Sequence, residues 1–286
     1  MNSKKKYNPY EWWTAVGERS VAGNKDNAKF DVNNKGFSLY DIPDIEAIPK
    51  FFKYIKKDTK VLDIGSGIGY YVINLINRGI TAHGCDISDS LLTICRQNSK
   101  IYNINSSGIF FIWDGHSLPF TGNSYDLVTT NTVLQHVINE KQIKDIFCDV
   151  SRVLKHNGYF CISELVSPKE FMPSIHVKQR TVENYLCIGK KYGFKAIEII
   201  HYPKLYGSIF YLYTILFNKS KEVEVKTNNK PDSDFIYNQN NNKNILRLLS
   251  QLTFFITNNF LNPIVRLLKI EKYFHSQVDI VFKLSK

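Results

Sequence analysis

The chain has 286 residues, of which 43% are hydrophobic, so it can bury a full core as one domain with elaborations. Its formal net charge of +11 could attract nucleic acid, but the lysines are scattered and many lie in Asn/Lys-rich stretches, which argues against that partner. The sequence begins MNSKKKYNPYEWW and shows no apolar run of a signal peptide, so we expect a cytoplasmic location. The cysteines show no paired spacing and are expected to be reduced core residues, with no disulfide and no metal site: Cys85, Cys95, Cys148, Cys161 and Cys187.

Residues 1–43 are expected to form a cap on the body of the protein. Tyr10, Trp12 and Trp13 stand close together ahead of a polar loop that contains glycines. They fit either a helix that packs its aromatic rings on the body or a flap that excludes water from a reacting centre. Apolar residues at helical spacing then predict a helix over 44–55.

From Val61 onward, short apolar runs alternate with segments of helical spacing. Strands are predicted at 61–64, 81–86, 108–113, 125–130 and 159–164, and helices at 70–78, 90–98, 141–154 and 182–192. This alternation predicts an α/β fold with a doubly wound, mostly parallel sheet. Two late strands, 195–202 and 277–284, bring the number to seven, and strands without a helix between them normally pair antiparallel.

About 70 residues separate these two late strands, which is far beyond the usual connection length. Residues 204–276 are therefore predicted to be a helical insertion before the last strand, with a disordered Lys/Asn-rich loop at about 218–244. The 13 residues of 205–217 are too few to span a bilayer, which takes about 20. Segments 205–217 and 245–270 combine apolar faces with basic residues, as in helices that lie on a membrane surface; the alternatives are packing on the sheet and a homodimer interface.

The stretch VLDIGSGIGYY, residues 61–71, reads as a buried strand, a tight turn of glycines and the start of a helix. Glycine is needed where the backbone takes conformations that a Cβ would block, or where a ligand approaches the main chain. Such a turn builds a nucleotide pocket at the carboxyl edge of an open α/β sheet. A dinucleotide fingerprint, G-x-G-x-x-G, would need its third glycine where this chain has Tyr70.

The D-x-G-x-G-x-G arrangement from Asp63 to Gly69 resembles the first motif of the class I S-adenosylmethionine-dependent methyltransferases. Residues 124–137 resemble the fourth-strand motif of the small-molecule branch of this family, and residues 154–159 resemble its fifth-strand entry, where Pro-Gly-Gly is more usual. The likeness covers roughly 44–202. It implies a Rossmann-like methyltransferase core over 44–203, completed by a last strand within 277–286, with S-adenosyl-L-methionine as the cofactor.

The resemblance also implies which residues hold the cofactor. Asp86 ends the second strand, about 20 residues after the glycines, where a carboxylate can take both ribose hydroxyls. Asp114 follows the third strand and can accept from the adenine amino group, while the backbone of Gly115 approaches the ring. Asp63 is expected to order the glycine loop and to meet the amino end of the cofactor through water. The full expected set is Asp63, Gly65, Ser66, Gly67, Asp86, Ile87, Asp114, Gly115 and Asn131.

A sulfonium donor is already activated, so such an enzyme chiefly aligns a nucleophile and excludes water. His136 follows the fourth strand and Glu164 ends the fifth, so both are expected on the acceptor side of the pocket. The hypothesis is that His136 is the base and that Glu164 orients it or binds substrate. The structural alternative has His136 packing beneath the cofactor.

The predicted function is methyl transfer to the oxygen or nitrogen of a small-molecule acceptor, with the insertion as lid and specificity element. Residues 131–133 read Asn-Thr-Val and lack the Asn/Asp-Pro-Pro-aromatic signature of enzymes that methylate the exocyclic amines of bases. This is a second argument against nucleic acid. Two alternatives stay open: a lipid or lipid-linked acceptor at a membrane surface, and a protein that binds the cofactor without catalysis.

Overall fold

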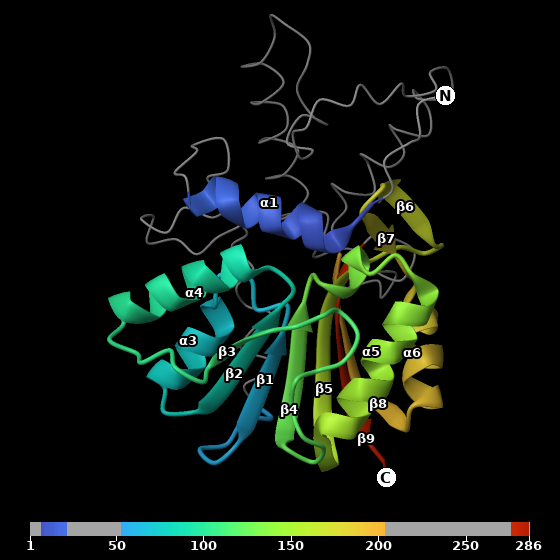
Figure 1. Ribbon diagram of the computed structural model, residues 1–286. Helices are drawn as coiled ribbons and strands as arrows, with labels where there is room; N and C mark the ends of the chain where they lie inside the picture. The colour runs from blue at the N-terminus through green and yellow to red at the C-terminus, as the bar shows by residue number, and fades with distance from the viewer. Residues whose placement is uncertain (1–6, 22–52, 204–275, 286) are drawn as a thin grey trace, which may run out of the picture.

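A computed structural model describes residues 7–21, 53–203 and 276–285 of the chain (Figure 1). Its main sheet consists of β1 (Lys60–Ile64), β2 (Thr81–Asp86), β3 (Phe110–Ile112), β4 (Tyr125–Asn131), β5 (Leu154–Val166), β8 (Phe194–Pro203) and β9 (Ser276–Leu284). The strand order is β3-β2-β1-β4-β5-β9-β8. Strands β1 to β5 pair in parallel, and β9 pairs antiparallel with both β5 and β8. The predicted seven-stranded, mostly parallel sheet with an antiparallel finish is therefore confirmed.

Helices cover both faces of this sheet (Figure 1). They are α3 (Tyr70–Asn77), α4 (Asp89–Ile101), α5 (Glu140–Val153) and α6 (Val182–Lys191), and α1 (Pro9–Val21) precedes them. Successive residues of a strand face opposite sides, so Val61 of β1 packs with residues of α3 and α4 while Leu62 packs with residues of α5 and α6. Strands buried on both faces explain the nearly continuous apolar runs in the sequence.

Side-chain caps fix where three of these helices begin. Ser88 accepts from the backbone N–H of Leu91, Asn139 accepts at the start of α5, and Thr181 accepts at the start of α6. Each cap satisfies backbone donors that have no partner within the helix. The beginnings of α4, α5 and α6 consequently lie within one residue of the predicted ones.

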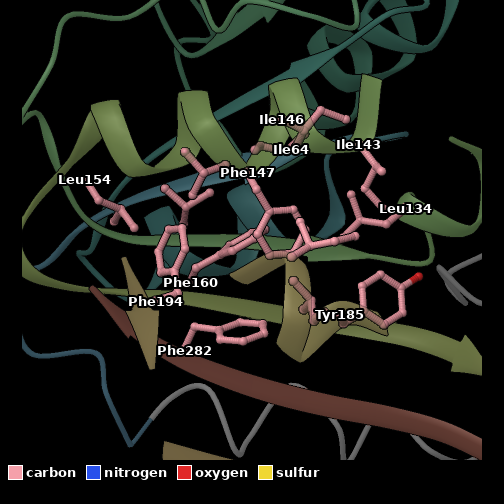
Figure 2. Packing of buried hydrophobic residues seen from close by; sticks show 14 of the residues in the cluster. Ile64, Leu134, Ile143, Ile146, Phe147, Leu154, Phe160, Tyr185, Phe194 and Phe282 are labelled. Atoms are coloured by element: carbon pink, nitrogen blue, oxygen red, sulfur yellow. The ribbon is translucent and has the colours of Figure 1, made fainter. Parts of the chain in front are cut away.

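Aromatic rings fill the core between α5, α6 and the sheet (Figure 2). The ring of Phe147 on α5 meets Phe160 of β5 at 5.2 Å and Phe282 of β9 at 6.0 Å between centroids, both edge-to-face. A Cβ on Gly189 of α6 would lie 2.8 Å from the Phe282 ring. The glycine therefore lets α6 approach the antiparallel part of the sheet.

The structure differs from the sequence predictions in several places. Strand β3 is shorter than predicted, and β5 begins at Leu154, with a register shift against β4 where Asn157 has a positive φ of 61°. A two-stranded hairpin, β6 (Phe171–Ser174) and β7 (Val177–Gln179), was not predicted. The expectation that all five cysteines are core residues is wrong for Cys148 and Cys187, which are exposed; all five are free thiols.

Other predictions lie outside the described residues. They are the helical insertion with its loop and most of the helix over 44–55. Only residues 53–55 of that helix are described, and they form a turn and irregular backbone. Pro203 at the end of β8 pairs with Ser276 at the start of β9, and Ser276 pairs with Val166 at the end of β5. Both attachment points of the insertion thus lie at the carboxyl edge of the parallel strands. Within the described ranges, no helix is long and apolar enough to cross a membrane.

Candidate functional site

The glycine turn after β1 is held by β2 and leaves part of its backbone open. The N–H groups of Gly65 and Ser66 both donate to the carbonyl of Cys85, at 2.8 and 3.0 Å. Gly65 and Gly67 have φ of +69° and +54°, which side-chain-bearing residues rarely adopt. A Cβ on Gly65 would lie 2.3 Å from Val133, whereas one on Gly67 would meet nothing within 4 Å. Gly65 is therefore required by packing, and Gly67 exposes backbone to a space that a ligand can fill.

Asp63, at the carboxyl end of β1, is the most unusual group beside this turn. It is 1% exposed, and neither carboxylate oxygen has a hydrogen-bond partner within the part of the chain that the structure describes. Burial, and then the nearby Asp86, raise the pKa of Asp63 well above its usual value. An unpaired buried carboxyl group is costly, so the site fits a ligand that brings a hydrogen-bond donor or a positive charge.

Asn131 adds a second buried acceptor at the same edge of the sheet. Its amide nitrogen donates to the Tyr71 hydroxyl, and its Oδ1 has no partner among the described residues. Burial raises the pKa of Tyr71, so the phenol is un-ionised. Asp63 and Asn131 together present acceptor oxygens, which suits the ammonium end of an amino acid.

Asp86 is hydrogen-bonded to the glycine turn and to the start of α4. Its Oδ2 accepts from the Gly67 N–H and its Oδ1 accepts from the Ser88 N–H, both at 2.9 Å. Burial raises the pKa of Asp86 to about 6, against the opposing effect of these N–H groups. Each carboxylate oxygen has a second lone-pair direction, so Asp86 can also receive hydroxyl donors.

Asp114 and Gly115 line an open pocket of about 710 Å³ together with Ile87, Trp113 and Gln142. The Asp114 Oδ1 accepts from the N–H groups of His116 and Ser117, at 2.8 and 2.7 Å. Partial burial works against ionisation, but these N–H groups hold the pKa of Asp114 below its usual value. Gly115 has a φ of +83°, and its carbonyl accepts from Gln142. An acid beside an open, partly apolar pocket fits a purine ring.

Helix α1 lies across the carboxyl edge of the sheet (Figure 1). The hydroxyl groups of Ser88 and Ser90 donate to the carbonyls of Trp13 and Thr14, at 3.1 and 2.8 Å. A Cβ on Gly17 would lie 2.2 Å from the Ser90 hydroxyl, so this glycine allows the two helices to touch. The start of α1 supplies Asn8, Pro9 and Tyr10 to the pocket of Asp114. The helix therefore packs aromatic rings on the body, and the residues at its start line the pocket.

His136 and Glu164 lie close in space but do not contact each other through their side chains. Glu164 is fully buried, and its carboxylate accepts from the backbone N–H groups of Val133, Leu134 and Gln135, at 2.9, 2.8 and 3.2 Å. These residues belong to or precede the short 3-10 helix η2 (Leu134–His136). Burial lowers the pKa of His136 to about 4, so its imidazole is neutral at physiological pH. Glu164 thus orients the segment that carries His136; whether His136 acts as a base stays a prediction.

The buried groups predict how stability of the cofactor-free protein depends on pH. Burial raises the pKa of Glu164 to about 7 and that of Asp63 well above its usual value, so the folded state holds these protons more tightly than the unfolded state. His136 acts in the opposite direction, most strongly below about pH 6.5, where most of the unfolded histidine is charged. Above that pH the histidine effect fades and the acids outweigh it, so stability should fall by about 1 kcal/mol or more between pH 6.5 and 8. Urea denaturation at both pH values measures this, and an unchanged or higher midpoint at pH 8 would contradict it.

The structure brings the predicted cofactor residues to one edge of the sheet, around the glycine turn and the pocket of Asp114. Sequence reasoning missed three residues of the same region: Tyr71, Gln135 and Arg180. The guanidinium of Arg180 is fully buried and donates to the carbonyls of Leu134 and Val137, at 3.0 and 2.7 Å. No linear motif marks Arg180, because its partners lie more than 40 residues away in sequence.

A family model described as "Methyltransferase domain" matches residues 55–216, which is more than half of the chain. The chain therefore belongs to this family, and its fold is that of the class I S-adenosylmethionine-dependent methyltransferases. The match begins just before β1 and runs past the end of β8, so it includes the glycine turn and the segment of His136.

Two curated relatives share parts of this region. The chain is 29% identical over 140 residues to the biotin biosynthesis bifunctional protein BioHC of Cellvibrio japonicus, covering 49% of this chain and 26% of that protein. It is 24% identical over 161 residues to the sterol 24-C-methyltransferase erg6 of Schizosaccharomyces pombe, covering 50% and 42%. The chain thus spans less than half the length of these relatives.

Among solved structures, phosphoethanolamine N-methyltransferase 2 of Haemonchus contortus in complex with S-adenosyl-L-methionine superposes with a TM-score of 0.54 at 19% identity. The superposition covers 84% of this chain and 52% of that one. At this identity the likeness shows a shared fold.

Proposed function

We propose that this chain is an S-adenosyl-L-methionine-dependent methyltransferase that transfers a methyl group to the oxygen or nitrogen of a small-molecule acceptor. The observation that carries this proposal is the buried Asp63 carboxyl group, which has no partner among the described residues and lies at the start of the glycine turn, where a Cβ on Gly67 would meet only open space. Membership of the methyltransferase-domain family supports it.

The residues present fit each part of the cofactor. Asp63 and Asn131 would receive its ammonium group, Asp86 its ribose hydroxyls, and Asp114 with Gly115 its adenine. When bound, the cofactor supplies a methyl group on a sulfonium. Gly65, Ser66 and Ile87 shape the turn and the pocket wall, and α1 limits the access of water from above.

Calorimetric titration with S-adenosylhomocysteine and with NAD tests cofactor choice. We expect binding of the nucleoside thioether and no binding of NAD, and we expect Asp86→Ala to lose the binding because the ribose hydroxyls lose their acceptor. Binding of NAD alone would overturn the assignment. Incubation of a metabolite extract with donor carrying a labelled methyl group then tests turnover, and binding without labelled product would favour a non-catalytic cofactor-binding protein.

A lipid or lipid-linked acceptor is the second candidate. The curated relative of Schizosaccharomyces pombe is named for a sterol, and both ends of the insertion join the sheet at the edge where the pocket opens. In this version of the proposal, the protein is cytoplasmic and contacts a membrane surface through segments 205–217 and 245–270. The insertion then selects the acceptor. Co-sedimentation with liposomes, comparing the full chain with a variant lacking the insertion, distinguishes this from an insertion that packs on the sheet or forms a homodimer.

A further inference from the structure

Gln135, in η2, carries a buried acceptor oxygen that the fold leaves unused. Its side chain is 6% exposed, and Oε1 has no hydrogen-bond partner within residues 7–21, 53–203 and 276–285. A buried acceptor without a partner destabilises the protein because it has lost its hydrogen bonds to water. A group that arrives with a hydrogen to donate would remove this cost.

The orientation of the Gln135 amide follows from its neighbours. The Nδ1 of His136 lies 3.0 Å from the carbonyl oxygen of His176, which can only accept, so Nδ1 carries the proton. In a neutral imidazole the other nitrogen, Nε2, is then an acceptor. This nitrogen lies 3.2 Å from Nε2 of Gln135, so the amide donates to it. The amide oxygen of Gln135 must therefore face away from His136.

The imidazole that imposes this orientation is itself held in place. Its ring stacks on the ring of His176, with centroids 5.6 Å apart, and Trp13 of α1 meets it edge-on at 4.9 Å. Trp12 stacks on the ring of His176 as well, with centroids 4.3 Å apart. The unpredicted hairpin that carries His176 and the covering helix α1 thus fix the His136 ring between them.

Gln135 is also close to the cofactor turn. It follows β4, whose last residue is Asn131, and Val133 touches the position of Gly65. Glu164 and Arg180 bind the N–H and C=O groups of the same segment. Gln135 therefore belongs to a firmly held segment whose other residues contact the glycine turn, through Val133, and α1, through His136 and Trp13.

We propose that Gln135 binds the nucleophilic group of the acceptor, with Oε1 accepting the N–H or O–H of an amine or a hydroxyl, and that His136 is a positioning residue for Gln135. This rests on the proposed methyltransferase function and names the class of its acceptor. An amide oxygen accepts a hydrogen bond and not a proton, so Gln135 orients the nucleophile and takes no part in proton transfer.

Two cofactor analogues test this without knowledge of the acceptor. S-Adenosylhomocysteine lacks the methyl group, and sinefungin carries an amino group where the methyl group would stand, next to the acceptor. We expect Gln135→Leu to leave the calorimetric Kd of S-adenosylhomocysteine unchanged and to weaken sinefungin about tenfold, as for one hydrogen bond to a charged group. Gln135→Glu has an acceptor oxygen at both positions of the side-chain end, so it does not depend on the orientation that His136 imposes on the amide and should keep the affinity for sinefungin.

His136→Phe tests the positioning role. Phenylalanine keeps a ring between Trp13 and His176 but cannot accept from the Gln135 amide, so sinefungin binding should weaken although thermal stability is retained. A role in packing alone would leave sinefungin binding unchanged.

Several results would overturn the inference. One is that Gln135→Leu changes the Kd of both analogues equally or changes neither. Another is that an extract labelled with [methyl-¹³C] donor yields a product with the methyl group on carbon or sulfur. If the leucine variant does not fold, weaker binding of sinefungin by a folded Gln135→Glu variant would count against it. Failure of the unmodified chain to bind S-adenosylhomocysteine would instead refute the proposed function.

Discussion

Replacing Gly67 with alanine is expected to lower the affinity for S-adenosylhomocysteine by at least about tenfold while the protein stays folded. A Cβ at this position meets no protein atom within 4 Å, so the protein itself has space for the methyl group. The cost to stability is the strain of a side-chain-bearing residue at a φ of +54°, about 1–2 kcal/mol. The space that the methyl group would occupy is the space assigned to the cofactor.

Gly79 and Gly108 provide matched controls for Gly67. Both have positive φ, +77° and +70°, and a Cβ on either also meets nothing within 4 Å. Alanine at these positions should cost similar stability and leave calorimetric binding unchanged. Gly65→Ala should lose more stability than the other three variants, because its Cβ would lie 2.3 Å from Val133 and would disturb the fold. If all four variants bind S-adenosylhomocysteine equally well, the glycine turn is not the cofactor site.

The regular part of the fold was predictable because local signals agreed with one another. The run from Val61 to Gly69 combines a buried strand with a glycine turn, and Ser88, Asn139 and Thr181 mark helix starts by hydrogen bonds within three residues. The hairpin of β6 and β7 gave no such signal. Its residues are partly exposed, and its position depends on contacts of His176 with α1 and η2.

The candidate site divides in the same way. Asp63, Asp86 and Asp114 lie at or just after the carboxyl ends of successive strands, so their sequence positions alone bring them to one edge of a parallel sheet. The contacts of Glu164 and Arg180 join residues about 30 and more than 40 positions apart, and the sequence offers no period from which to infer them. The hypothesis that Glu164 orients His136 placed the right residue nearby, but the contact runs through the backbone of residues 133–135.

Glu164→Ala is expected to have the largest effect on stability, lowering the free energy of unfolding by about 3–5 kcal/mol. The substitution leaves the N–H groups of Val133, Leu134 and Gln135 without their acceptor, two of them in buried hydrogen bonds, in the segment whose carbonyls bind the fully buried Arg180. Glu198→Ala on β8 is the matched control, because this acid pairs with the half-exposed Lys53 and accepts from the Tyr54 hydroxyl near the surface, and its removal should cost much less. Urea denaturation of both variants measures the difference. A Glu164→Ala protein that is as stable as Glu198→Ala would contradict the predicted loss of unfolding free energy. It would also contradict the inference that Glu164 holds the segment of Gln135 and His136 in place.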